Sequence, residues 1–179
     1  LEKYTCNMTK LGRNLMRLAL LSSGVKDLSV MQSLDTPTIW LRLLHYPPIS
    51  KNSPSDLYGS APHTDFGCLT ILAQDEIGGL QVQTREGKWI DVPKLEGSFV
   101  VNVGDMLSRY TNGLLRSTPH RVINKSGKER FSCPFFFDPH TNAVVQPLKG
   151  TGKPKFSPIN FGEFLREELE ASYEKHKKI

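Results

Sequence analysis

The sequence contains few cysteines and no long apolar run. Cys6, Cys68 and Cys133 are its three cysteines among 179 residues, and none forms a Cys-x-x-Cys pair. An odd, scattered set of this kind predicts neither a disulfide framework nor a zinc cluster, and it fits reduced thiols. No apolar stretch approaches the roughly 20 residues that span a bilayer. We therefore expect a cytoplasmic protein with no membrane contact.

The charge pattern also lacks a nucleic-acid-binding signature. Lysine and arginine number 23 against 18 acidic residues, which gives a net charge of +5. The basic residues are spread along the chain, and no aromatic residues interleave with a basic stripe. Hydrophobic residues make up 38% of the chain and charged residues 23%, which is ordinary for one globular domain. We expect no nucleic-acid partner, and the charge excess predicts solubility.

A histidine and a carboxylate begin a run rich in strand-forming residues. His63 and Asp65 are two positions apart, so a β-strand would aim both side chains at one point. A lone His-x-Asp pair is more often a surface or hydrogen-bonded pair than a metal site. A second histidine, His120, lies in another strand-like run at residues 117–123. Two histidines and one carboxylate are the facial set that binds non-haem Fe(II) and leaves coordination positions open.

A second polar pair follows ten residues after His120. Arg130 and Ser132 occupy alternate positions of a probable strand, so they share one face. A guanidinium beside a hydroxyl suits a carboxylate, because the planar fork binds both carboxylate oxygens. Alone, an Arg-x-Ser pair usually marks an outward polar face. Its place in an ordered series of paired residues favours a binding role.

The ordered motifs resemble one enzyme family. They are His63-Thr64-Asp65-Phe66-Gly67, Gly78-Gly79-Leu80-Gln81-Val82, Val101-Asn102-Val103-Gly104-Asp105, Ser117-Thr118-Pro119-His120-Arg121-Val122 and Arg130-Phe131-Ser132-Cys133-Pro134. Across residues 39–148 the sequence is similar to the isopenicillin N synthase-like family of Fe(II)/2-oxoglutarate dioxygenases.

This resemblance implies roles for six residues. His63, Asp65 and His120 would bind Fe(II), which also binds O2. Arg130 and Ser132 would bind the distal carboxylate of 2-oxoglutarate, and Tyr46 matches a tyrosine that often contacts this co-substrate. Plant members of the family often carry asparagine two residues before that tyrosine, where this chain has Leu44. Members usually carry roughly a hundred further residues before this point, so we expect the chain to be a fragment of a longer protein.

The predicted fold is mainly β, a double-stranded β-helix (jelly roll) with flanking helices. Many short strands with turn signals, and helices at both ends, favour this fold over a Rossmann-type fold, and the resemblance implies the same. We expect a single catalytic domain over residues 1–179, with a helical lead-in at 1–37, a jelly-roll core at 38–148 and a C-terminal loop and helix at 149–179. Within it we predict helices at 8–21, 27–34, 106–111 and 160–176, and strands at 38–46, 66–73 (continuing from His63), 80–84, 89–92, 98–103, 115–123 and 130–137.

Three functions are compatible with the sequence. The leading one is an oxygenase that oxidises a C–H bond of a small molecule and releases succinate and CO2 from 2-oxoglutarate. The second is an oxidase of the same family that does not consume 2-oxoglutarate, and the third is a non-catalytic binding module. Asn102 and Leu72 are expected to line the pocket, whereas Asp105 and Asp138 are expected to be structural. The loop at 49–61 and the closing helix are the expected substrate determinants.

Overall fold

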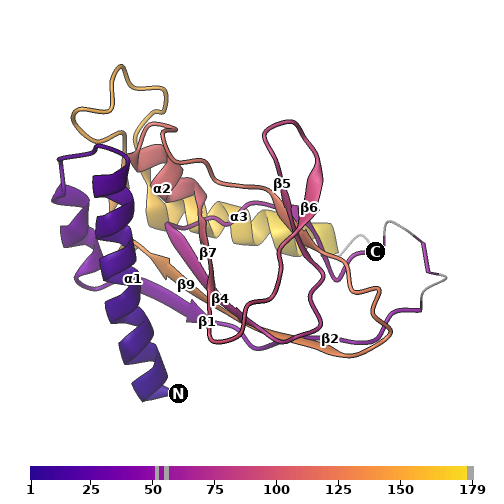
Figure 1. Ribbon diagram of the computed structural model, residues 1–179. Coiled ribbons are helices and arrows are strands. Elements are labelled where there is room, and N and C mark those ends of the chain that lie inside the picture. Colours follow the sequence, from indigo (N-terminus) through magenta and orange to yellow (C-terminus); the bar gives the residue numbers. More distant parts are fainter. Residues whose placement is uncertain (51–52, 55–56, 177–179) are drawn as a thin grey trace.

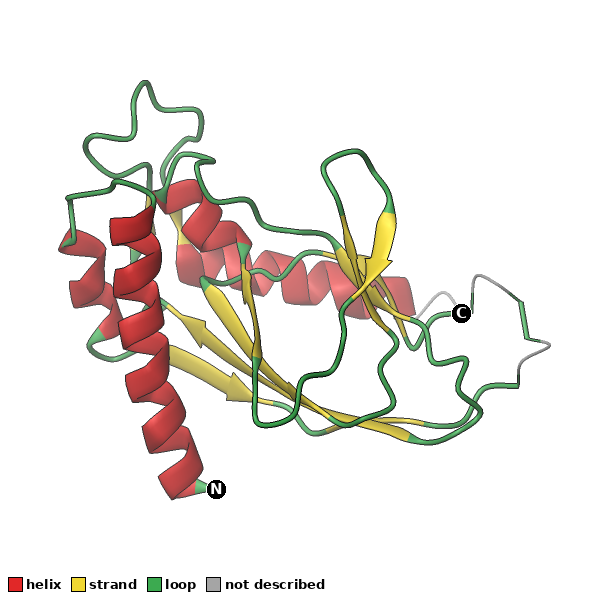
Figure 2. Ribbon diagram, in the orientation of Figure 1, coloured by secondary structure: helices red, strands yellow, loops and turns green. Residues whose placement is uncertain are grey.

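The computed structural model describes residues 1–50, 53–54 and 57–176. These residues form a five-stranded and a four-stranded antiparallel sheet and a short two-stranded one. Helices gather around one end of the larger sheet and behind it (Figure 1, Figure 2). The two main sheets and the flanking helices agree with the predicted jelly roll. Within the described residues, none of the helices has the length and apolar composition needed to cross a bilayer.

The described part of the chain forms four helical elements and eleven strands. The helical elements are α1 (Glu2–Ser22), the 3-10 helix η1 (Ser29–Leu34), α2 (Asp105–Tyr110) and α3 (Phe161–His176). The strands are β1 (Thr38–Leu41), β2 (Leu44–Tyr46), β3 (Ser60–His63), β4 (Leu69–Gln74), β5 (Leu80–Gln83), β6 (Trp89–Asp91), β7 (Val100–Val103), β8 (His120–Val122), β9 (Arg130–Asp138), β10 (Val144–Val145) and β11 (Ile159–Asn160).

The larger sheet is organised around β9. It has the order β1-β9-β4-β7, and β2 continues the β1 side of β9. The predicted single strand at 38–46 is therefore two strands, which is a correction to our prediction. The break lies at Arg42, whose N–H donates to the carbonyl of Pro134. Proline has no N–H to return the second bond of that pair, so the ladder is interrupted there.

The smaller sheet has the order β3-β8-β5-β6. His63 and His120 are direct partners across β3 and β8, and the register shifts between Ser60 and His63. Val82 lies opposite His120 on the other side of β8. This pairing places the two histidines side by side on the face that looks toward the larger sheet.

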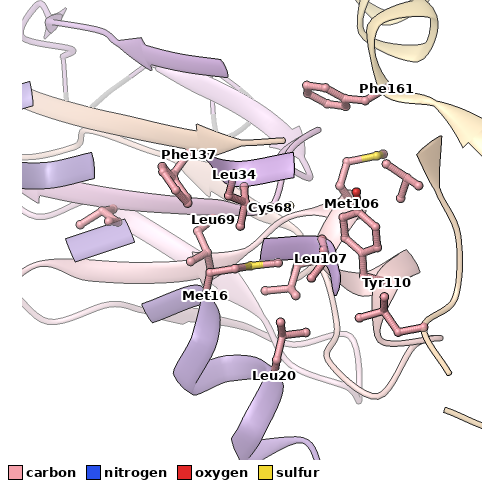
Figure 3. Close-up of a cluster of buried hydrophobic side chains, with 14 of the residues drawn as sticks. Met16, Leu20, Leu34, Cys68, Leu69, Met106, Leu107, Tyr110, Phe137 and Phe161 are labelled. Atoms are coloured by element: carbon pink, nitrogen blue, oxygen red, sulfur yellow. The ribbon is translucent and has the colours of Figure 1, made fainter. Parts of the chain in front are cut away.

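The main core lies on the outer face of the larger sheet. Phe135 and Phe137 of β9 are fully buried there and pack with side chains of α1, α2 and β4 (Figure 3). The approach of α1 is close, because a Cβ at Gly12 would lie 2.7 Å from the ring of Phe137. Burying a phenylalanine contributes about 1.5–3 kcal/mol, so this face supplies much of the stability of the fold.

The chain crosses between the sheets directly after His63, and our prediction of one continuous metal-bearing strand is wrong. β3 ends at His63 in the smaller sheet, whereas β4 begins at Leu69 in the larger one. Gly67 makes the crossing possible, because a Cβ there would lie 1.5 Å from the Asp138 carboxylate oxygen. The same oxygen accepts the N–H of Cys68. Only glycine fits this approach.

Several further bounds differ from our predictions. α1 begins at Glu2 instead of residue 8, and Tyr4, one turn before Met8, packs against the main core. The segment predicted at 115–123 is a strand only over His120–Val122, and the β10–β11 pair was not predicted. The N-cap of α3 is confirmed, because the Asn160 side chain accepts the N–H of Glu163 at 3.0 Å.

Candidate metal centre and its pocket

A pocket of about 100 Å³ lies between the inner faces of the two sheets. The smaller sheet supplies its histidines, and the larger sheet supplies residues of β2, β4, β7 and β9. Its polar or charged lining residues include Arg42, Tyr46, Ser60, His63, Asp65, Thr70, Asn102, Thr118, His120, Arg130 and Ser132. Its apolar lining residues are Leu44, Leu72, Leu80, Val82, Val100, Val122, Pro134 and Phe136.

His63, Asp65 and His120 converge on one point of this pocket. Their candidate ligand atoms all lie within 4.8 Å of one another. The Nε2 atoms of His63 and His120 are 3.7 and 3.5 Å from Oδ1 of Asp65. The predicted convergence is therefore present, although Asp65 lies in the turn after β3 and not in the strand. Their role as metal ligands stays a prediction.

Each histidine is held by the carbonyl two residues before it. Nδ1 of His63 lies 2.7 Å from the oxygen of Ala61, and Nδ1 of His120 lies 3.2 Å from that of Thr118. Since a carbonyl only accepts, each Nδ1 carries the proton and each Nε2 keeps a free lone pair. This contact fixes the tautomer and the ring orientation that a metal ligand needs.

Asp65 is oriented by two donors from the larger sheet. Its Oδ2 accepts hydrogen bonds from Thr70 Oγ1 at 2.5 Å and from Asn102 Nδ2 at 2.7 Å. The side chain is only 7% exposed. With Oδ2 occupied, Oδ1 is the oxygen that faces the two histidines.

The surroundings favour a neutral His63. Burial lowers the pKa of this imidazole below its ordinary value, and the charges of His120 and Arg42 lower it further. The carbonyl of Ala61 and the carboxylate of Asp65 act in the opposite direction. A neutral imidazole keeps its Nε2 lone pair available to a metal at lower pH than an ordinary histidine.

Arg130 lies at the inner end of the pocket and is fully buried. Its Nε donates to the carbonyl of Gly78 at 2.6 Å, and its Nη2 donates to Oε1 of Gln74 at 3.3 Å. Nη1 is buried and has no hydrogen-bond partner among the described residues. A buried donor on a charged group is costly when it is left unpaired. The arrangement therefore suits an anionic group that would reach Nη1.

The other predicted co-substrate residues surround Arg130. Tyr46 lies opposite it in the β2–β9 ladder, and its ring centroid is 4.7 Å from the guanidinium carbon. Ser132 is 7% exposed and lines the same pocket. Leu44 lies opposite Ser132 and presents an apolar side chain to the pocket.

Sequence reasoning found some of the lining residues and missed others. Asn102 and Leu72 line the pocket as predicted. Thr70, which lines the pocket, and Gln74, which bonds to Arg130, were missed, because we expected Leu69, Ile71 and Ala73 to share the face of His63. In the structure Thr70 pairs with Phe136 and Gln74 with Ser132, on the even-numbered face of β9.

Asp105 and Asp138, which we expected to be structural, hold parts of the fold together. Asp105 accepts the Thr64 hydroxyl at 3.2 Å at the start of α2, and Asp138 accepts the N–H of Cys68. The remaining histidines lie elsewhere. His45 stacks on Phe131, and Nδ1 of His140 accepts the N–H of Asn142. The side chain of His176 lies outside the described part of the chain.

Comparison with known proteins agrees with this site. A profile described as the 2OG-Fe(II) oxygenase superfamily matches residues 38–139. A probable iron/ascorbate oxidoreductase of Dictyostelium discoideum is 42% identical over 162 residues, which cover 82% of this chain and 44% of that protein. Homoarginine-6-hydroxylase of Glycine max is 36% identical, with 92% and 53% of the two chains covered.

Solved structures show the same relationship. A full-length Neurospora crassa protein in complex with alpha-KG and thymine aligns with a TM-score of 0.88 and 32% identity, over 96% of this chain and 55% of that one. This likeness confirms the predicted jelly-roll fold. The chain spans about half the length of the curated relatives it matches. The matched profile, the sequence relatives and the shared fold together establish that this chain belongs to the 2OG-Fe(II) oxygenase superfamily.

Proposed function

We propose that this chain carries the catalytic centre of an Fe(II)- and 2-oxoglutarate-dependent oxygenase that oxidises a C–H bond of a small molecule. The observation that carries the proposal is the position of Arg130. Its buried, unpaired Nη1 lies in the same pocket as the His63–Asp65–His120 group. A metal site and a carboxylate site in one cavity are what a chelating, dianionic 2-oxo acid requires.

The donor set fits Fe(II). Two neutral imidazoles and one carboxylate leave coordination positions open on non-haem Fe(II) for other ligands. The three side chains are already oriented by the carbonyls of Ala61 and Thr118 and by Thr70 and Asn102. Such supporting contacts lower the reorganisation needed when a metal binds. His63, Asp65 and His120 are therefore the proposed ligands.

The inner end of the pocket fits the distal carboxylate of 2-oxoglutarate. Arg130 offers Nη1 as a charged donor, and the Ser132 hydroxyl lines the pocket two residues along the same strand. Tyr46 covers the guanidinium face and limits its rotation. Leu44 supplies no polar contact, so Arg130, Ser132 and Tyr46 are the proposed co-substrate residues.

The residues of the chain prepare the reaction by binding and shielding. Bound Fe(II), 2-oxoglutarate and O2 supply the oxidising chemistry, with succinate and CO2 as co-products. Asp65 provides a negative charge, and its second oxygen is held in place by hydrogen bonds from Thr70 and Asn102. Leu72, Val82 and other apolar side chains line the pocket around the centre.

The alternatives have less support. An oxidase that does not consume 2-oxoglutarate leaves the buried Nη1 of Arg130 without an explanation. A non-catalytic binding module leaves the orientation of both Nε2 atoms and of Asp65 without one. The substrate is proposed only as a small molecule, the class to which the thymine of the Neurospora complex belongs.

An anaerobic titration tests the proposal. Purified apo-protein receives Fe(II) and then 2-oxoglutarate, while the visible metal-to-ligand charge-transfer band is recorded. We expect the band in wild type and at least about tenfold weaker co-substrate affinity in Arg130→Ala, since charged hydrogen bonds are usually worth about 1.5–3 kcal/mol. Arg17→Ala, an exposed arginine of α1, is the control. Iron binding without the band would favour the oxidase, and no iron binding would favour the binding module.

We also propose a cytoplasmic location. Its support is that Cys6, Cys68 and Cys133 are all free thiols in the structure, which is usual in a reducing compartment. Microscopy of a fluorescent fusion of the whole protein tests this proposal.

A further inference from the structure

A second arginine reaches the pocket at its exposed end. Arg42 follows β1, and its N–H donates to the carbonyl of Pro134 at 3.1 Å. It alternates with Leu44 and Tyr46, so all three side chains point to the same face, and all three line the pocket. Arg42 is exposed, whereas Arg130 is buried. The pocket therefore has a cationic group at each end.

Among the described residues, no acidic side chain pairs with Arg42. Within the described part of the chain, its side chain makes no hydrogen bond or ion pair. Arg42 and His63 line the same pocket. A guanidinium in this exposed position is open to a ligand that enters the pocket.

The charges of the pocket leave one positive charge uncompensated. Arg42 and Arg130 are cationic, Asp65 is anionic, and His63 and His120 would be neutral as metal ligands. Bound Fe(II) and dianionic 2-oxoglutarate cancel each other, so the loaded centre keeps a surplus of +1. Arg130 would bind the distal carboxylate of the co-substrate. The surplus positive charge therefore lies on Arg42.

Part of the wall between the two arginines is apolar. Leu72, Val82, Val100 and Phe136 line the cavity on the larger and smaller sheets. A ligand that fits this space has an apolar body, and an anionic group at one end would meet Arg42. The planar fork of arginine binds a carboxylate through two parallel hydrogen bonds.

We propose that Arg42 is a specificity-determining residue that binds the carboxylate of the primary substrate, which is therefore a small amphipathic monocarboxylate. This inference rests on the proposed function, because the charge count includes Fe(II) and 2-oxoglutarate. Arg42 would hold the carboxylate end at the mouth of the pocket while the apolar body extends toward the metal.

Ligand-observed NMR tests this role without any turnover. The protein is loaded with Mn(II) and 2-oxoglutarate under exclusion of other ligands, and the paramagnetic relaxation of probe protons reports binding near the metal. The probes are hexanoate and phenylacetate, each compared with its neutral amide. We expect wild type to prefer the carboxylates by about tenfold or more, the usual value of a charge-assisted hydrogen bond.

Three variants identify the group responsible. Arg42→Gln should abolish the preference, whereas Arg42→Lys keeps the positive charge and should retain part of it. Arg17→Gln removes the same charge from the far side of the larger sheet and should behave as wild type. A preference that survives Arg42→Gln would mean that the carboxylates bind the metal or Arg130, and it would overturn the inference. Equal binding of acids and amides to wild type, including no binding of either, would overturn it as well.

The Fe(II) charge-transfer band separates this failure from failure of the proposed function. If wild type forms the band but shows no carboxylate preference, only the role of Arg42 is wrong. If wild type forms no band, the proposed function fails and the inference fails with it. A band that needs more 2-oxoglutarate in Arg42→Gln, combined with an unchanged carboxylate preference, would assign Arg42 to the co-substrate and overturn the inference.

Discussion

The two faces of β9 differ in what they bury. On the outer face, Phe135 and Phe137 are fully buried among apolar side chains. On the inner face, Arg130 is equally buried but keeps a donor without a partner. Burial alone therefore does not distinguish a structural residue from a functional one. The distinction lies in whether the buried group is satisfied by the chain itself.

The alternation of a single strand separates stability from function. On one face of β9, Phe135 and Phe137 lie in the main core, whereas the even-numbered positions from Arg130 to Phe136 face the pocket. A substitution on one face should change the free energy of unfolding, and one on the other face should change ligand affinity. Four experiments test this separation.

The largest effect is expected from Phe137→Ala. Removing a buried aromatic ring leaves a cavity beside Gly12, and such changes usually cost about 3–5 kcal/mol of unfolding free energy. Urea unfolding measures the loss. Phe131→Ala is the matched control on the same strand, since Phe131 is 51% exposed, and it should lose less than about 1 kcal/mol. Equal losses in the two variants would contradict the difference in burial between Phe137 and Phe131.

A smaller effect is expected behind the metal centre. Thr70→Val and Asn102→Ala each remove one donor to Oδ2 of Asp65. Loss of such a supporting contact typically weakens metal affinity by about 10–100-fold. Calorimetric titration with Fe(II) under anaerobic conditions measures the change. Thr9→Val makes the same substitution in α1, on the outer side of the sheet, and should leave the affinity unchanged.

The third prediction concerns Asp138, where the two sheets meet. Burial raises the pKa of this carboxyl from 3.8 to about 7; the charge of Asp65 acts in the same direction, and the N–H of Cys68 opposes the shift. Between these pH values the folded protein holds a proton that the unfolded chain has released. The free energy of unfolding should therefore fall as the pH rises from about 4 to about 7, and level off above.

Asp138→Asn tests this pH dependence. The amide does not ionise, so urea unfolding at a series of pH values should show a reduced slope between about pH 4 and about pH 7. At neutral pH the variant should be at least as stable as wild type, because no ionised carboxylate is buried. An unchanged slope would show that other groups cause the pH dependence.

The smallest effect is expected from Gln74→Met. Its Oε1 lies 3.3 Å from Nη2 of Arg130, so Gln74 positions the guanidinium. One hydrogen bond of this kind is worth about 0.5–1.5 kcal/mol, which predicts roughly 2–10-fold weaker 2-oxoglutarate binding. The charge-transfer titration measures it, and KM for 2-oxoglutarate should rise more than kcat falls. Gln83→Met, in which the lost bond is to the carbonyl of Gly87, is the control.

Much of the site was readable from residue types and spacing. His63, Asp65 and His120 converge as predicted, and the simple alternation of Arg130, Ser132, Pro134 and Phe136 holds along β9. These features depend on local period and on motif order, which a sequence contains. The roles of the residues and the proposed division of the chain at residues 37 and 148 stay predictions.

The missed features depend on long-range contacts. The crossing at Gly67 follows from its approach to Asp138, a residue 71 positions later in the chain. Thr70 faces the pocket because β4 starts anew in the other sheet, so parity counted from His63 does not apply. Arg42 reaches the pocket through its pairing with Pro134. No local pattern encodes these pairings.

The supporting contacts of the metal centre also have a mechanical meaning. His63 and His120 belong to the smaller sheet, whereas Asp65 is bonded to Thr70 and Asn102 of the larger one. An ion held by all three side chains is a cross-link between the two sheets. Removing the ion with a chelator should therefore speed amide hydrogen exchange in β3 and β8, while β9 beneath α1 keeps its protection. The bound ion would therefore limit how far the smaller and the larger sheet can separate.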